Sequence, residues 1–329
     1  MPSSTSSSDD SSTAARAAKR ALIALAAVFV ALNAIALGIW QALPLSKVSE
    51  GRYLAAVEDH LAMLRDSKGE KGRVILLGGS GVAFSISAES LSEQLDRPVY
   101  NGGIQASIGI RNLIDLYEPH LDPENDLIVL VPELELIASD ARYSATWCDV
   151  VFLRKDWSNL TGRPRCVPHI LHRTYQDIRH HISNTNATDP VYRRSGFNAV
   201  GDLTSHLGIE SAPTDFGDYT MPDVTDAKLN SFKAYVQTNL IDKGFDVLYV
   251  PAAMPVAACE ANRERISRIA ASLGKLSYFE GAADEIDRFC LEHHLFFDGA
   301  GHLNREGRVI QTENVRNALA QVLADKASN

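Results

Sequence analysis

Residues 73–81 read Arg-Val-Ile-Leu-Leu-Gly-Gly-Ser-Gly, and this stretch decides the fold. The run 74–77 is short and uniformly apolar, which is typical of a parallel strand buried on both faces. The glycines that follow predict a tight turn, because glycine lets the backbone bend sharply and lets a ligand approach it closely. Ser80 lies inside this turn. It is the first candidate for a reactive side chain.

Downstream of this stretch, apolar runs alternate with helical patterns. Such an alternation predicts an α/β domain with a mostly parallel sheet, here over residues 72–329. Residues 138–225 show little periodicity, so we expect an insertion packed over one end of the sheet rather than one long loop. The further predicted strands are 98–101, 127–131 and 246–250, and the predicted helices are 87–95, 108–117, 226–243, 261–273 and 304–324.

The N-terminal region predicts a membrane anchor. Residues 1–20 predict a disordered tail, and residues 21–43 a transmembrane helix, because no formal charge occurs from 21 to 46. As a helix, residues 21–39 would rise about 28 Å, close to the hydrocarbon thickness of roughly 30 Å. The alternative is a cleaved signal peptide, whose apolar region is typically shorter, about 7–15 residues. Residues 44–71 predict a helical stalk.

Charge predicts the orientation and excludes one class of partner. Arg16, Lys19 and Arg20 precede the apolar segment, so the positive-inside rule places the N-terminus in the cytoplasm. The expected location is the cell (inner) membrane, as a single-pass protein with a periplasmic or otherwise extracytoplasmic domain. The formal net charge is −9 and no basic stripe is present, so no nucleic acid partner is expected.

The four cysteines, Cys148, Cys166, Cys259 and Cys290, all follow the apolar segment. Outside the cytoplasm disulfides persist. We predict that Cys148 and Cys166 lie with their Cα atoms within about 7 Å, close enough for a disulfide; the full pairing stays open. No metal site is expected, because none of the four has the spacing of a zinc ligand set.

Two further segments carry groups that could act together with Ser80. Asn101-Gly102-Gly103 follows the second predicted strand, and residues 298–304 form a polar loop before the last helix. The carboxyl ends of parallel strands share one edge of the sheet, where open α/β folds bind ligands. In the second segment His302 can serve as a general base and Asp298 can orient it.

The order of these segments resembles the SGNH (GDSL-like) hydrolase superfamily. The stretches LLGGSGVAFSI (76–86), VYNGGIQASIGIRN (99–112) and FFDGAGHLNREG (296–307) carry the resemblance, and GFNAVGDLTSHL (196–207) has a similar character. They look more particularly like a membrane-anchored bacterial branch, the accessory proteins of cell-surface polysaccharide acylation. The resemblance covers roughly residues 72–135 and 245–325.

This resemblance implies a three-layer, parallel-sheet, SGNH-like (flavodoxin-like) domain and a serine esterase or O-acyltransferase. Ser80 would be acylated, His302 would take its proton, and Asp298 would hold the imidazole. The N–H groups of Gly103 and Ser80 would stabilise the oxyanion, and Asn101 and Glu133 would belong with Gly103 to the oxyanion and substrate-binding site. No cofactor is implied. The implied partners are a carbohydrate polymer as substrate and a membrane-bound O-acyltransferase or polysaccharide synthase complex.

Three departures from the family pattern favour a second interpretation. Gly79 stands where the family has an aspartate before the serine, and Asp298 stands four residues before His302 instead of three. At the end of the third strand Glu133 replaces the expected Gly-x-Asn-Asp, which leaves the asparagine donor unidentified and brings a negative charge toward the site. The alternative is a non-catalytic SGNH-like protein that binds polysaccharide or an acyltransferase partner.

Overall fold

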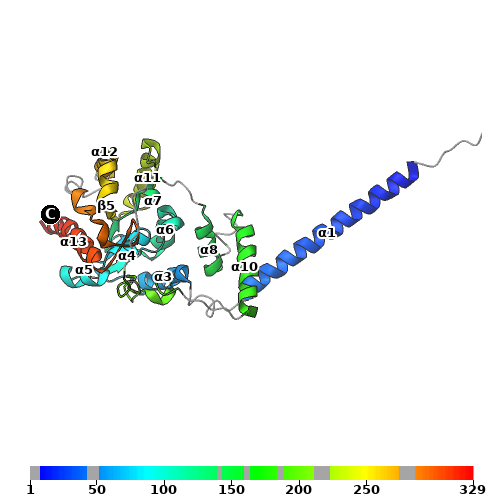
Figure 1. Ribbon diagram of the computed structural model, residues 1–329, viewed down its shortest axis with the longest axis horizontal. Helices are drawn as coiled ribbons and strands as arrows, with labels where there is room; N and C mark the ends of the chain where they lie inside the picture. Colours follow the sequence, from blue (N-terminus) through cyan, green and yellow to red (C-terminus); the bar gives the residue numbers. More distant parts are fainter. Residues whose placement is uncertain are drawn as a thin grey trace, which may run out of the picture.

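The computed structural model shows a mixed α/β domain and one long N-terminal helix (Figure 1). The structure describes residues 8–42, 52–138, 143–156, 158, 164–183, 189–210, 223–273 and 286–328. Within these residues the main sheet holds four parallel strands in the order β2-β1-β3-β4. Their bounds are β1 Val74–Leu77, β2 Val99–Asn101, β3 Leu127–Leu130 and β4 Asp246–Tyr249. The predicted α/β class is confirmed.

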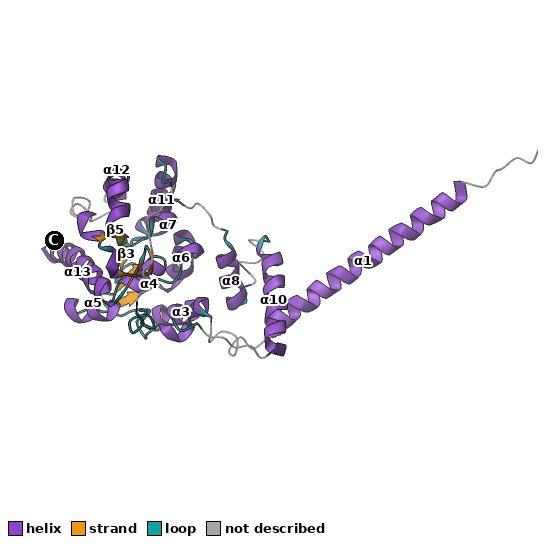
Figure 2. Ribbon diagram, viewed as in Figure 1, coloured by secondary structure: helices purple, strands orange, loops and turns teal. Residues whose placement is uncertain are grey.

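Helices cover both faces of this sheet (Figure 2). Side chains alternate along a strand, so Ile75 and Leu77 of β1 belong to one core cluster, whereas Val74 and Leu76 belong to another. Both clusters are apolar, which explains why β1 and β3 consist of apolar residues only. The first face packs against α3 (Ala56–Asp66), α6 (Ile110–Tyr117) and α11 (Asp226–Asn239), and the second against α5 (Ala88–Leu95) and α13 (Arg305–Ser328).

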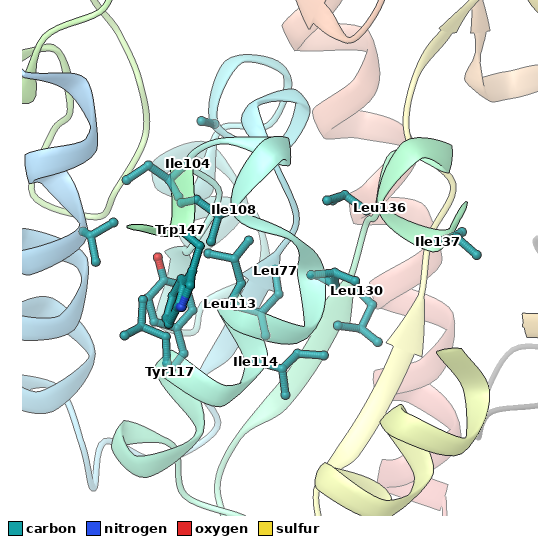
Figure 3. Close-up of a cluster of buried hydrophobic side chains, with 14 of the residues drawn as sticks. Leu77, Ile104, Ile108, Leu113, Ile114, Tyr117, Leu130, Leu136, Ile137 and Trp147 are labelled. Carbon is teal, nitrogen blue, oxygen red and sulfur yellow. The ribbon is translucent and has the colours of Figure 1, made fainter. Parts of the chain in front are cut away.

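The first of these cores is drawn in Figure 3. Leu113 and Ile114 of α6 lie on the side of Leu77, and Trp147 of the insertion joins the same buried cluster. Leu77, Leu113 and Ile114 are fully buried. Burial of each such side chain contributes about 1.5–3 kcal/mol, so the insertion is attached to the domain through its apolar core.

Helix α1 (Ser8–Ala42) is the one described helix that is long and apolar enough to cross a membrane. Its candidate span is Ala15–Ala42, and the helix projects away from the domain in Figure 1. The predicted boundary at residue 20 is corrected, because the helix begins at Ser8. Alanine is the best helix former, and the Ala-rich turn at 14–18 continues the apolar helix toward the N-terminus. Residues 1–7 of the predicted tail lie outside the described residues.

The predicted stalk (44–71) is also corrected. From residue 52 onward this segment belongs to the domain, because the helical stripe that contains Val57, Leu61 and Leu64 is buried against the sheet. A stripe of apolar residues at helical spacing is a core-facing surface, and here the core that it meets is the domain's own. Residues 43–51 lie outside the described residues.

The first part of the insertion forms two helices, α8 (Ala145–Arg154) and α10 (Cys166–Ser183), which lie between α1 and the sheet domain in Figure 1. A disulfide joins Cys148 to Cys166 with a Cα–Cα distance of 5.2 Å, which confirms the predicted proximity. The indole of Trp40 is fully buried and donates to the Phe152 carbonyl at 2.8 Å. The end of α1 is therefore docked on α8.

The described second part of the insertion, residues 189–210, attaches to two helices of the domain. Asp202 is fully buried and accepts hydrogen bonds from the N–H groups of Ala88 (2.9 Å) and Glu89 (3.2 Å) at the start of α5. It also forms an ion pair with Arg308 of α13 at 3.3 Å. Carboxylates are favourable at helix N-termini, so the insertion caps α5 from outside its own sequence.

The C-terminal part builds the region around the last predicted loop. Strand β5 (Met254–Pro255) pairs in parallel with β6 (Cys290–Leu291), and a disulfide joins Cys259 to Cys290. Strands β7 (Phe296–Gly299) and β8 (His302–Leu303) form an antiparallel hairpin before α13. The remaining elements include α4 Ser80–Ser85, α7 Leu134–Ala138, α12 Val256–Leu273, β7 Phe296–Gly299, β8 His302–Leu303 and the 3₁₀ turns Tyr53–Ala55, Ala106–Ile108, Glu118–His120, Arg194–Gly196, Ile241–Lys243, Ile286–Phe289 and His293–Leu295.

Candidate active site

Ser80 is placed by the sharp junction between β1 and α4. The strand ends at Leu77, and Gly79 is the N-cap of the helix that Ser80 begins. A Cβ atom on Gly79 would lie 2.7 Å from the Cα of Ala106 and 2.6 Å from Glu133 Oε1, so only glycine fits. Within the part of the chain that the structure describes, Ser80 Oγ makes no hydrogen bond. The hydroxyl is therefore available to a substrate.

His302 and Asp298 come from the β7–β8 hairpin and contact each other. Asp298 Oδ1 lies 2.6 Å from His302 Nδ1. The pairing of β7 with β8 is irregular between Phe296 and Gly299, and the glycine-containing turn takes up the additional residue that separates Asp298 from His302. The expected Asp298–His302 contact is present. Because Nδ1 is engaged, Nε2 is the imidazole nitrogen left for a reaction.

The imidazole of His302 is also held from one face by an aromatic ring. Phe84 of α4 stacks on it with the ring centroids 4.0 Å apart and the ring planes 10° apart. Phe84 lies one turn after Ser80 in the same helix, so the nucleophile candidate and the support of the imidazole share one rigid element.

Tyr192 of the insertion is the residue that sequence reasoning missed. Its hydroxyl donates to Asp298 Oδ2 at 2.6 Å and lies 3.3 Å from His302 Nδ1. Its ring packs against those of Tyr53 and Phe84, each with a centroid distance of 5.6 Å. Tyr192 lies in a segment without periodicity, so apart from its polar hydroxyl nothing in the sequence predicted its place at the site. The contact depends on how the insertion folds back over the sheet.

The charge state of this group follows from burial and hydrogen bonding. Burial raises the pKa of Tyr192, and its hydrogen bond to Asp298 raises it further, so the hydroxyl stays protonated and donates. Burial raises the pKa of Asp298, but the hydrogen bonds from His302 and Tyr192 together outweigh it and leave the pKa below its ordinary value. Asp298 is therefore an ionised carboxylate at neutral pH.

Glu133 lies at the site but in an unexpected role. It follows β3, and its carboxylate accepts from Gly79 N–H at 2.9 Å and from Gly81 N–H at 2.7 Å. These two N–H groups flank Ser80 along the chain. The negative charge expected from the sequence is thus beside the nucleophile. It occupies backbone donors of the type that would otherwise stabilise an oxyanion.

Asn101 and Gly103 lie in the core instead of the site. Asn101 is fully buried, and its Nδ2 donates to the Val82 and Ile86 carbonyls (3.2 Å each) and to Asp202 Oδ1 (3.0 Å). Its Oδ1 accepts from Gly103 N–H at 2.9 Å. The predicted oxyanion role of Gly103 and the predicted substrate contact of Asn101 are corrected. Their polar groups hold the turn after β2 against α4 and the insertion.

Ser80, Glu133 and His302 line one cavity of about 250 Å³. Ser85 Oγ ties α4 to the hairpin loop, because it donates to the Gly301 carbonyl at 2.9 Å and accepts from Leu303 N–H at 3.2 Å. Among the described residues no hydrogen bond joins Ser80 to His302. Catalytic hydrogen bonds are often long before substrate binds, so the distance between these two side chains stays a prediction.

Among the described residues, no cluster of three or more His, Cys, Asp or Glu side chains could hold a metal ion. Comparison of the chain with protein-family models, with characterised proteins and with solved structures finds no match. The functional assignment therefore depends on the site itself.

Proposed function

We propose that this protein is an SGNH-like serine esterase or O-acyltransferase that acts on an exported or cell-surface polysaccharide. The observation that carries the proposal is the arrangement of three side chains. His302, with Nδ1 bonded to the ionised Asp298, lines the same cavity as the hydroxyl of Ser80 at a strand-to-helix turn. A nucleophile, a base and a group that orients the base are the parts of a hydrolytic triad.

In this mechanism Ser80 Oγ attacks the carbonyl carbon of an ester, and His302 Nε2 takes its proton. The ester C–O bond then breaks, and the leaving alcohol receives that proton from the imidazolium, which Asp298 stabilises. Water or a sugar hydroxyl attacks the acyl–Ser80 ester in the second half-reaction. The first turn of α4 offers the N–H of Ser80 itself as an oxyanion donor, since the first N–H groups of a helix have no partner within it.

The disulfides support a location outside the cytoplasm. The structure joins Cys148 to Cys166 and Cys259 to Cys290, and no cysteine is free in the part of the chain that it describes. Disulfides persist in oxidising compartments and are rare in the cytosol. With α1 as an anchor and its N-terminus in the cytoplasm, the domain would face the periplasm. There it would meet a carbohydrate polymer and a membrane-bound O-acyltransferase or polysaccharide synthase complex.

A second candidate function is binding without catalysis, and the contact of Glu133 favours it. Two N–H groups that flank Ser80 are occupied by a carboxylate, and the Gly103 N–H is bonded inside the core. A protein with this arrangement could hold a sugar or an acyltransferase partner at the cavity without forming an acyl-enzyme.

A serine-directed phosphonate probe separates the two functions. The full-length protein in detergent should be labelled once, at Ser80, and the Ser80→Ala variant should not react. Ser90→Ala is the matched control, because Ser90 lies on α5 away from the cavity and its loss should leave labelling unchanged. A folded wild-type protein that shows no labelling would favour the binding function.

A further inference from the structure

The cavity beside Ser80 has both polar and apolar lining. Ser80, Glu133 and His302 contribute the polar side chains, and residues of β4, β5 and α12 contribute an apolar wall. This wall consists mainly of Tyr249, Met254, Ile266 and Ile269, which are exposed by 7 % or less. A substrate group that reaches this wall from Ser80 exchanges water for apolar contacts.

The wall is held in place by links between segments that are distant in sequence. Met254 of β5 pairs in register with Cys290 of β6, and Cys290 is joined by a disulfide to Cys259 near the start of α12. The same helix presents Ile266 and Ile269 to the cavity. The apolar wall is therefore fixed by the strand pairing and the disulfide of the fold.

The charges of the described lining residues disfavour an anionic group. Glu133 contributes a carboxylate, and no lysine or arginine lines the cavity in the described residues. A buried anion needs a positive partner, so a substituent such as a succinyl or phosphate group would be opposed here. A neutral apolar chain has no such cost.

The size of the cavity sets the length of that chain. An apolar cavity of about 150 Å³ holds benzene, which has six carbon atoms. The present cavity of about 250 Å³ exceeds that volume and includes the space at Ser80 itself. An acetyl group would leave the apolar wall uncovered.

We propose that Tyr249, Met254, Ile266 and Ile269 form an acyl pocket for a neutral, aliphatic chain of about four to eight carbons. This inference depends on the proposed function, because the chain would be the acyl group carried by Ser80. It goes beyond that function in naming the substrate: the donor is a medium-chain ester rather than an acetyl ester.

The first test is the chain-length dependence of p-nitrophenyl ester hydrolysis by the full-length protein in detergent. Each buried CH₂ group favours binding about fourfold, so kcat/KM should rise at least tenfold from acetyl to hexanoyl. It should fall again for dodecanoyl, which exceeds the cavity. A highest kcat/KM with the acetyl ester would overturn the inference and leave the proposed esterase function in place.

The second test alters the wall. Ile269→Trp should fill the pocket and lower the hexanoyl-to-acetyl ratio of kcat/KM at least tenfold, whereas Ile269→Ala should move the preference toward longer chains. Ala271→Trp is the matched control, since Ala271 lies on the exposed side of the same helix and does not line the cavity. Unchanged chain-length ratios in both folded Ile269 variants would refute the pocket.

A third measurement does not need turnover. Hexylphosphonate and methylphosphonate probes should label Ser80 at rates that differ at least tenfold in favour of hexyl, with Ser80→Ala as the blank. Equal rates would refute the acyl pocket alone. No labelling by either probe would reject the esterase function, and the acyl pocket with it.

Discussion

Replacing Glu133 with glutamine should raise the esterase activity, because Glu133 opposes the charge that develops during acyl transfer. Its carboxylate accepts from the N–H groups of Gly79 and Gly81 at 2.9 and 2.7 Å. These donors flank Ser80, and the oxyanion forms on the carbonyl oxygen of the ester that Ser80 attacks. An oxyanion and a carboxylate repel each other and compete for the same type of donor.

The size of the effect follows from these two hydrogen bonds. A hydrogen bond to a charged group contributes about 1.5–3 kcal/mol. Glutamine retains one acceptor oxygen but places an NH₂ group opposite the second N–H, so one such bond is lost. Each 1.36 kcal/mol corresponds to a factor of ten. We therefore expect kcat/KM of Glu133→Gln to exceed the wild-type value by about 10- to 100-fold.

The assay is hydrolysis of p-nitrophenyl butyrate, with the melting temperature measured alongside. The same lost bond should lower the free energy of unfolding by about 1.5–3 kcal/mol. Glu124→Gln is the control, because Glu124 is exposed and distant from the cavity lining. A folded Glu133→Gln variant with activity tenfold below wild type would refute the reasoning, because Glu133 would then assist the reaction.

Asp298→Asn should reduce turnover by about 10⁴ while Ser80 still reacts with a phosphonate, and near-wild-type turnover would exclude Asp298 as the orienting group. The pKa of Asp298 is lowered on folding, so its contribution to stability is complete above the unfolded pKa of about 3.9 and is lost as the pH falls through the folded value. The free energy of unfolding should therefore depend less on pH in this acidic range in Asp298→Asn than in the wild type. An unchanged pH dependence would assign it to another group. Tyr192→Phe removes one hydrogen bond to a charged carboxylate and should lower kcat about tenfold with KM unchanged; an effect on KM alone would contradict a positioning role. Removal of the Cys148–Cys166 disulfide by Cys148→Ala/Cys166→Ala should lower the free energy of unfolding in urea by about 3 kcal/mol, and a change below about 1 kcal/mol would argue against it.

The sheet could be predicted because its signals are local. The apolar run of β1 followed by glycines marks a buried strand and its turn, β2 is likewise followed by two glycines, and β3 and β4 each lie in a short apolar run. The N-cap of α5 was predictable for the same reason, since Ser87 accepts from Ser90 N–H three residues later. Asp298 and His302 are also close in sequence, and their contact was expected on that basis.

The sequence did not show whether a residue serves the site or the packing of the core, nor which core a helix packs against. Asn101 has the polar side chain and the position after a strand that are typical of a ligand-binding residue, yet it is buried among carbonyl groups and Asp202. The helix around Val57 and Leu61 has the pattern of any amphipathic helix, and the sequence does not say which core it meets. In both cases the partner comes from a segment far away in the chain.

The sequence by itself determined the α/β class, the strand-to-helix turn that holds Ser80, and the pairing of Asp298 with His302. These features arise from backbone preferences and from neighbours within a few residues. Only the tertiary structure decided that Glu133 binds the N–H groups on both sides of Ser80 and that Tyr192 holds Asp298. The physical reason is that these contacts join segments separated by 50 residues or more. Such contacts form only when the packing of the sheet, the insertion and the hairpin brings the side chains together. No local sequence pattern predicts them.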